Sequence, residues 1–117
     1  MDTRDGALPE RGRDDIEVRL DRARPVHGMT ALRDAVIDVV RSGSPVLRVD
    51  VAALGELSST TVTALLWAQR RCRARGGVVV LSGVDRRNRR ILEQSGLARV
   101  LPVEEPASAL VRRRASA

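Results

Sequence analysis

Aromatic side chains are almost absent from this sequence: Trp67 is the only one, and neither Phe nor Tyr occurs. Hydrophobic residues still make up 43% of the 117 residues, so Val, Leu, Ile and Ala supply enough volume for helices packed on a small sheet. Nucleic-acid-binding proteins often stack bases on aromatic side chains. Without such side chains or a recognised motif, we expect no direct binding of nucleic acid.

Residues that build redox, metal and catalytic sites are also scarce. The single cysteine, Cys72, excludes an internal disulfide and is expected in the core. The single histidine, His27, has no cluster of Cys, His or carboxylates at ligand spacing. No nucleophile, base and orienting acid can be assembled, and no Gly-rich phosphate-binding loop is present. The sequence therefore predicts a non-enzymatic protein with neither a cofactor nor a metal.

Long apolar runs are missing too. No stretch approaches the roughly 18 residues that a membrane-spanning helix requires, and the start of the chain lacks the charged-then-apolar pattern of a signal peptide. We therefore expect a cytoplasmic protein that does not insert into a membrane.

Lysine is absent, so all 21 cationic residues are Arg. Residues 1–60 carry 9 Arg and 11 acidic residues, whereas residues 61–117 carry 12 Arg and 4 acidic residues, which gives net charges of −2 and +8. A basic half of this kind attracts anionic partners. The Arg clusters within 70–75 and 86–90 are typical of helix faces exposed to solvent. The alternative is that they bind an acidic protein.

The length of the chain suits one domain. Residues 1–14 are charged and interrupted by Gly and Pro, which predicts a disordered tail, whereas 15–114 should form a single domain and 115–117 should fray. The hydrophobic pattern predicts an α/β fold with strands over 16–20, 46–51, 78–81 and 100–103. Helices are expected over 31–41, from the hydroxyl run at 58–61 to Gly76, from Asp85 to Gly96, and from Pro106 onward. The continuous apolar run at 78–81 predicts an interior strand covered on both faces.

Four consecutive hydroxyl residues, Ser58 to Thr61, stand where the second predicted helix begins. The first turn of a helix has unpaired N–H groups and the positive end of the dipole, both of which suit hydroxyl oxygens or phosphate. N-capping is the simplest interpretation, although four hydroxyl residues exceed what one cap requires. Thr60, Thr63 and Trp67 share a helix face with this junction. Trp67 is therefore either a half-buried packing residue or a contact for a partner.

Asp50, Leu54, the hydroxyl run eight to eleven residues after Asp50, and Leu65 resemble the signature segment of STAS domains, the anti-sigma factor antagonist family. Residues 76–103 resemble the second half of the family, with Ser-Gly-Leu at 95–97 in place of its usual Thr-Gly-Leu turn. The resemblance covers about residues 16–111. It implies a STAS-like α/β fold, with a small mixed β-sheet of four to five strands packed with about four α-helices.

In that family the helix start usually reads Asp-Ser-Ser-Gly, and the first Ser is the phosphorylatable one. Laid on this sequence, the four family residues fall on Ser58, Ser59, Thr60 and Thr61, so only Ser59 matches. The resemblance therefore implies Ser59 as the candidate phosphoacceptor in a degenerate motif. The partner-binding surface that it implies comprises Leu57, Ser58, Ser59, Thr60, Thr61, Thr63 and Trp67.

The function implied by the resemblance is that of a binding module. Such a module engages an anti-sigma factor with a kinase-like ATP-binding domain and regulates the release of a sigma factor, with phosphorylation as the switch. Two alternatives remain at this point: a STAS scaffold that is not phosphorylated, and an accessory subunit of a lipid-transport ATPase. A homo-oligomer is compatible with the sequence.

Overall fold

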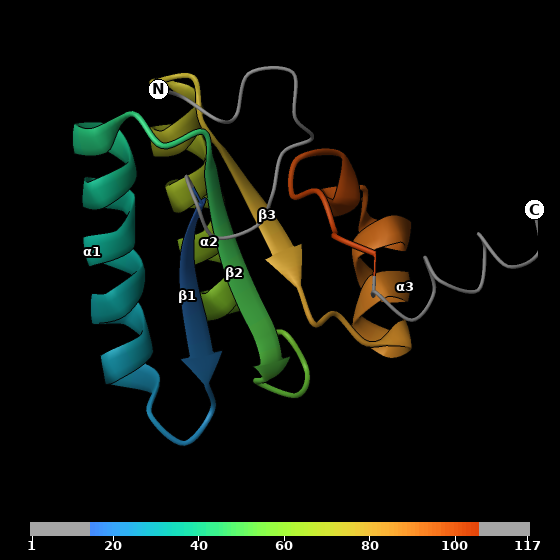
Figure 1. Cartoon of the computed structure of the whole chain (residues 1–117). Coiled ribbons are helices and arrows are strands. Elements are labelled where there is room, and N and C mark those ends of the chain that lie inside the picture. The colour runs from blue at the N-terminus through green and yellow to red at the C-terminus, as the bar shows by residue number, and fades with distance from the viewer. Residues whose placement is uncertain (1–14, 106–117) are drawn as a thin grey trace, which may run out of the picture.

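The computed structural model describes residues 15–105. Along the chain it contains β1 (Asp15–Asp21), α1 (Pro25–Ser42), β2 (Val46–Ala53), α2 (Ser59–Arg73), β3 (Val78–Ser82), α3 (Arg86–Ser95) and a short 3-10 turn (Leu97–Arg99). Strands and helices alternate, which confirms the predicted α/β class (Figure 1). The predictions for the tail 1–14, the helix from Pro106 and the end 115–117 lie outside the described residues.

The strands form one parallel sheet in the order β1-β2-β3. For the described residues, the prediction of a mixed sheet with four to five strands is therefore wrong: three strands are present, and all of them are parallel. The strand expected at 100–103 is reduced to one bridge between Leu81 and Val103. Likewise, the described part of the chain has three α-helices where about four were expected over the whole domain.

The side chain of Gln69 explains why the fourth strand does not form. Its amide nitrogen donates to the carbonyl oxygens of Val79 at 3.0 Å and Val100 at 2.7 Å, and its amide oxygen accepts from the N–H of Val79 at 2.7 Å. Both backbone groups of Val79 are thus satisfied by a side chain of α2. A fourth strand would need the same groups, so regular pairing along β3 is limited to the neighbourhood of Leu81.

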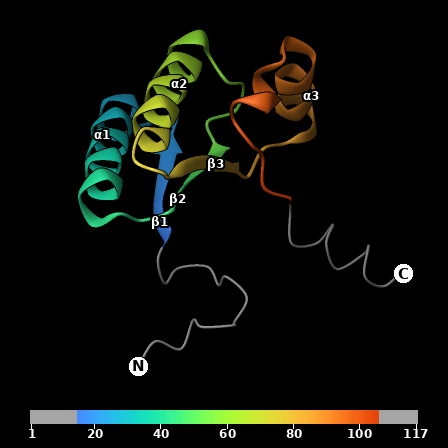
Figure 2. The same cartoon turned by 90° about the horizontal axis from the view of Figure 1, so that it is seen from above.

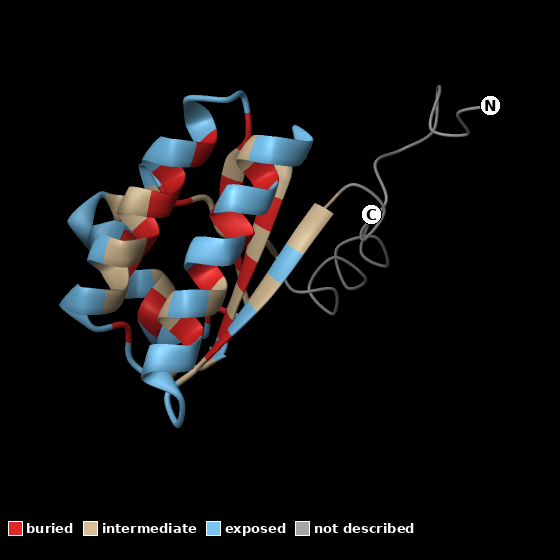
Figure 3. Ribbon diagram, turned by 90° about the vertical axis from the view of Figure 1, so that its left-hand side faces the viewer, coloured by how far each residue is buried: buried red, intermediate tan, exposed pale blue. Residues whose placement is uncertain are grey.

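Helices α1 and α2 pack side by side on one face of the sheet, and α3 lies beyond β3 (Figures 1 and 2). The core between them is aliphatic, and the buried parts of both helices face the sheet (Figure 3). Cys72 is fully buried in this core, as expected, and burial raises the pKa of its thiol. Close aliphatic packing replaces the missing aromatic volume.

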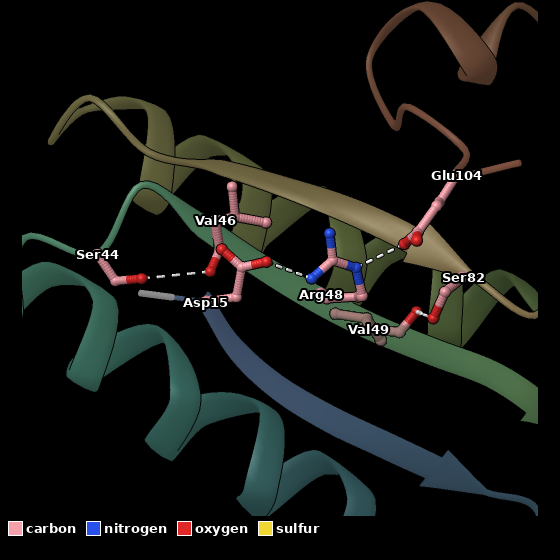
Figure 4. Close-up of polar contacts among 7 residues, drawn as sticks. All are labelled: Asp15, Ser44, Val46, Arg48, Val49, Ser82 and Glu104. Atoms are coloured by element: carbon pink, nitrogen blue, oxygen red, sulfur yellow. Dashed lines mark hydrogen bonds and ion pairs between the residues drawn. The ribbon is translucent and has the colours of Figure 1, made fainter. Parts of the chain in front are cut away.

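The opposite face of the sheet carries no helix among residues 15–105 (Figure 2). The prediction that residues 78–81 are covered on both faces is therefore wrong for the described chain, because only alternate residues of β3 are fully buried. Arg48 lies on this uncovered face and forms ion pairs with Asp15 and Glu104 (Figure 4). Burial lowers the pKa of Arg48, but the two carboxylates outweigh that effect and raise it overall.

Helix α1 begins at Pro25, six residues before the predicted start at residue 31. Proline suits the first position of a helix because that position has no intrahelical partner for an N–H group. Gly28 lies inside α1 and packs closely on β1: a Cβ atom there would lie 3.3 Å from Cδ2 of Leu20. The predicted helix end at Gly96 is confirmed, and Gly96 and Gly43, which follows α1, both adopt the left-handed conformation.

Candidate functional site

The hydroxyl run lies at the start of α2, where Ser58 is the N-cap. The hydroxyl oxygen of Ser58 accepts from the N–H of Thr61 at 3.1 Å, and the Ser58 hydroxyl also lies 3.1 Å from the hydroxyl of Thr61 and donates to it. The capping interpretation is therefore correct for Ser58, and Thr61 is its partner. These two hydroxyl groups serve the helix itself.

The next hydroxyl groups are in a different situation. Ser59, Thr60 and Thr63 are exposed, and within residues 15–105 their side chains form no hydrogen bond. Ser59 is the first residue of α2, beside the unpaired N–H groups of its first turn. These three hydroxyl groups are available to solvent or to a partner.

Trp67 and Leu57 differ in their accessibility. Trp67 is half-buried, and the guanidinium carbon of Arg71 lies 5.9 Å from the centre of its ring, in a cation–π contact. Leu57, at 8% exposure, belongs to the hydrophobic core. The structure thus brings six of the seven predicted partner-binding residues together along the start and outer face of α2, and it places the Leu57 side chain inside.

Asn88 of α3 is a site residue that sequence reasoning missed. Its buried side chain accepts from the N–H of Leu57 at 3.2 Å and donates to the carbonyl oxygen of Gly55 at 2.7 Å. Asp85 caps α3 through the N–H of Asn88, as predicted for the start of this helix. Asn88 therefore fixes the loop that leads into α2. The sequence feature that could have revealed Asn88 is its position four residues before buried Leu92, on the same helix face.

Two hollows flank the start of α2. One, of about 630 Å³, lies between α2 and α1 and is lined by Ser59, Thr63 and Trp67 on one side and by Arg33 on the other. The second, of about 310 Å³, lies beneath the cap, where Ser58 and Thr61 meet the β1–α1 connection. Thr60 lines both hollows. The hydroxyl groups thus form a ridge between two depressions, which is a shape suited to contact with another molecule.

Metal-binding groups do not gather at this ridge among the described residues. Among residues 15–105, no group of three or more His, Cys, Asp and Glu side chains comes together in a way that would hold a metal ion. Within the same residues, every helix is too short or too polar to span a bilayer. Besides its hydroxyl groups, the site contains one aromatic ring and guanidinium groups, and both kinds of group are enriched in protein interfaces.

Comparison with known proteins identifies the family. The sequence profile described as "Mlab, STAS domain" matches residues 10–103, most of the chain. The chain belongs to the STAS domain family. The predicted family is thereby confirmed. No curated protein matches the chain.

Two solved structures resemble this STAS domain. The NMR structure of the protein TM1081 is 12% identical, with a TM-score of 0.66, and the match covers 88% of this chain and 83% of that one. The structure of the Bacillus cell fate determinant SpoIIAA in the phosphorylated form is 19% identical, with a TM-score of 0.53, and the match covers 90% of this chain and 96% of that one. At these identities the likeness establishes a shared fold. The role of Ser59 stays a prediction.

Proposed function

We propose that this STAS domain is a non-enzymatic binding module that engages an anti-sigma factor with a kinase-like ATP-binding domain. By doing so it regulates the release of a sigma factor, and phosphorylation of Ser59 switches the contact. One observation carries the proposal: Ser58 and Thr61 close the helix cap with each other, which leaves Ser59 exposed and without a side-chain partner within residues 15–105.

A phosphate on Ser59 changes the surface and leaves the fold intact. It adds a charge of about −1.5 to −2 at neutral pH. The N-terminus of a helix favours negative charge, because its N–H groups and dipole point toward the anion. Arg33 lines the same hollow as Ser59 and supplies a positive charge nearby. The domain therefore tolerates the phosphate, and the partner meets a bulky anion in place of a hydroxyl group.

The decisive experiment is a pull-down from the native cell lysate with this protein as bait, carried out once with ADP and once with ATP. We expect a kinase-like anti-sigma factor to be retained with ADP and released with ATP, with phosphate on Ser59 in the ATP sample. Mass spectrometry identifies both the partner and the modified residue. An unmodified Ser59 in a released sample contradicts the switch.

Matched variants separate binding from folding. Ser59→Asp is expected to keep the melting temperature and to lose the partner, whereas Ser59→Ala should retain the partner with either nucleotide. Gln94→Glu is the control, because it adds one negative charge at an exposed position of α3. Substantial unfolding of Ser59→Asp, or equal loss of the partner by Gln94→Glu, would count against the proposal.

A second candidate function is binding without phosphorylation, either as a scaffold or as an accessory subunit of a lipid-transport ATPase. Two observations favour it. Ser58 and Thr61 stand where the antagonist motif has Asp and Gly, and they form an uncharged cap with each other. The matching profile also carries the name Mlab. A partner retained equally with ADP and ATP supports the scaffold, and a transporter ATPase among the retained proteins supports the accessory subunit.

A further inference from the structure

A groove follows the line between α1 and α2, starting beside the hydroxyl ridge. Its first part is the hollow of about 630 Å³ next to Ser59. A third hollow, of about 340 Å³, continues from it and is lined by Ile37 and Arg41 of α1 and by Arg71 of α2. Arg33 and Trp67 line both hollows, so the two adjoin. The groove therefore extends along α2 from its first turn to its last turns.

The floor and one wall of this groove are apolar. Trp67 lies half-buried at the junction of the two hollows. Ile37, on the α1 side, exposes 42% of its surface, and Val40 beside it is half-buried. A partly exposed tryptophan beside an exposed aliphatic side chain is typical of an anchor point in a protein interface. A single exposed aliphatic residue is ordinary, but Ile37 and Val40 line the same hollow as the ring of Trp67.

The charged residues of the groove are all positive. Arg33, Arg41 and Arg71 are exposed and line it, and no acidic side chain does. Within residues 15–105, none of the three forms an ion pair, although Arg71 contacts the ring of Trp67. The groove thus presents an apolar floor beneath uncompensated positive charge, which calls for a complementary negative partner.

We infer that the groove docks an amphipathic helix of the partner protein, with an apolar ridge flanked by acidic residues. The inference rests on the proposed function, because it extends the same surface from Ser59 to the far end of α2. Trp67 and Ile37 contact the apolar ridge. Arg33, Arg41 and Arg71 pair with acidic side chains on either side of the ridge.

The dimensions of the groove fit a helix of a few turns. Thr60 and Arg71 of α2 both line it, and at 1.5 Å per residue they are about 16 Å apart along the helix axis. Three turns of a helix occupy the same length. A groove between two neighbouring helices accepts the side-chain ridge of a third, with anchors at i, i+3, i+4 and i+7.

Trp67 itself provides the measurement, because it is the sole aromatic residue of the chain. Two synthetic helical peptides of about four turns share one leucine ridge and lack aromatic residues. One has Glu beside the ridge, and the other has Lys at the same positions. We expect the Glu peptide to change the emission of Trp67 saturably, more weakly as salt rises, and the Lys peptide to leave it unchanged. No response to the Glu peptide, or an equal response to both, overturns the inference.

Charge-reversal variants locate the contact. The double variant Arg33→Glu/Arg41→Glu should bind the Glu peptide at least about tenfold more weakly. The matched control is Arg86→Glu/Arg90→Glu, which changes the net charge equally at exposed positions of α3. Equal affinity of the two double variants contradicts the groove. Phosphatidylglycerol vesicles are tested in parallel, and a change in Trp67 emission with vesicles but not with the Glu peptide would assign the groove to lipid and overturn the inference.

The same variants, tested in the pull-down, distinguish a failure of the groove inference from a failure of the proposed function. If Arg33→Glu/Arg41→Glu retains the anti-sigma factor as well as the unaltered chain does, the groove inference fails and the proposed function stands. If the unaltered chain retains no such factor, the proposed function fails, and the peptide titration still decides whether the groove receives an acidic helix.

Discussion

The two faces of α2 carry polar side chains in opposite situations. On the inner face, Gln69 is 1% exposed and makes three hydrogen bonds to the backbone of Val79 and Val100. On the outer face, Thr60 and Thr63 are exposed and form no hydrogen bond within the described residues. A buried amide must be paired or it destabilises the fold, whereas water satisfies an exposed hydroxyl group. The inner polar group therefore serves the structure, and the outer ones are available for recognition.

The arginines show the same contrast. Arg48, on the uncovered face of the sheet, is compensated by Asp15 and Glu104. Arg33 and Arg41, beside α2, have no ion-pair partner among residues 15–105. Charge that is compensated within the chain attracts little from outside. The arginines of the proposed groove are therefore available to an acidic partner.

The largest expected effect belongs to the inner face. Gln69→Leu keeps a similar side-chain volume but leaves both backbone groups of Val79 and the carbonyl of Val100 without their partner. Because a buried unsatisfied group costs about 1–3 kcal/mol, the free energy of unfolding should fall by about 3 kcal/mol or more, measured by urea denaturation. Gln94→Leu, at an exposed position of α3, should change it by less than about 0.5 kcal/mol. Similar values for the two variants would remove the distinction between inner and outer polar groups.

A smaller effect is expected where α3 fixes the start of α2. Asn88→Ala leaves the N–H of Leu57 and the carbonyl of Gly55 unpaired, which should lower the free energy of unfolding by about 2 kcal/mol. Amide hydrogen exchange should accelerate more at Leu57 than at Val49 in the centre of the sheet, because the loop opens locally. Equal acceleration at both amides would mean that Asn88 supports the whole domain and has no special role at the loop.

The smallest effects distinguish two neighbouring serines on the recognition side. Ser58→Ala removes the cap and should cost about 1 kcal/mol. Ser59→Ala removes an exposed hydroxyl group without a partner and should cost less than about 0.5 kcal/mol. Thermal and urea denaturation of the pair provide the measurement. If Ser59→Ala proved as destabilising as Ser58→Ala, Ser59 would have a structural role, and its candidacy as a phosphoacceptor would weaken.

The local features of the fold were predictable. The cap of α3 at Asp85 and the helix end at Gly96 follow from residues within one turn of each boundary. The hydroxyl run at the start of α2 was predictable for the same reason, and so was the clustering of Thr60, Thr63 and Trp67 on one helix face. The predicted start of α1 was six residues too late. Gly28 lies in the part that was missed, and its contact with Leu20 of β1, which accounts for the glycine, is tertiary.

The sequence by itself determined the family, the α/β alternation and the polar character of the α2 start, because periodicity and capping depend on residues a few positions apart. Only the tertiary structure decided which polar side chains form hydrogen bonds inside the domain. Gln69 reaches β3 across 10 residues of sequence, and Asn88 reaches the α2 loop across 31 to 33 residues. The groove likewise needs α1 and α2 side by side. Such contacts depend on how the helices pack on the sheet, and local sequence patterns do not determine that packing.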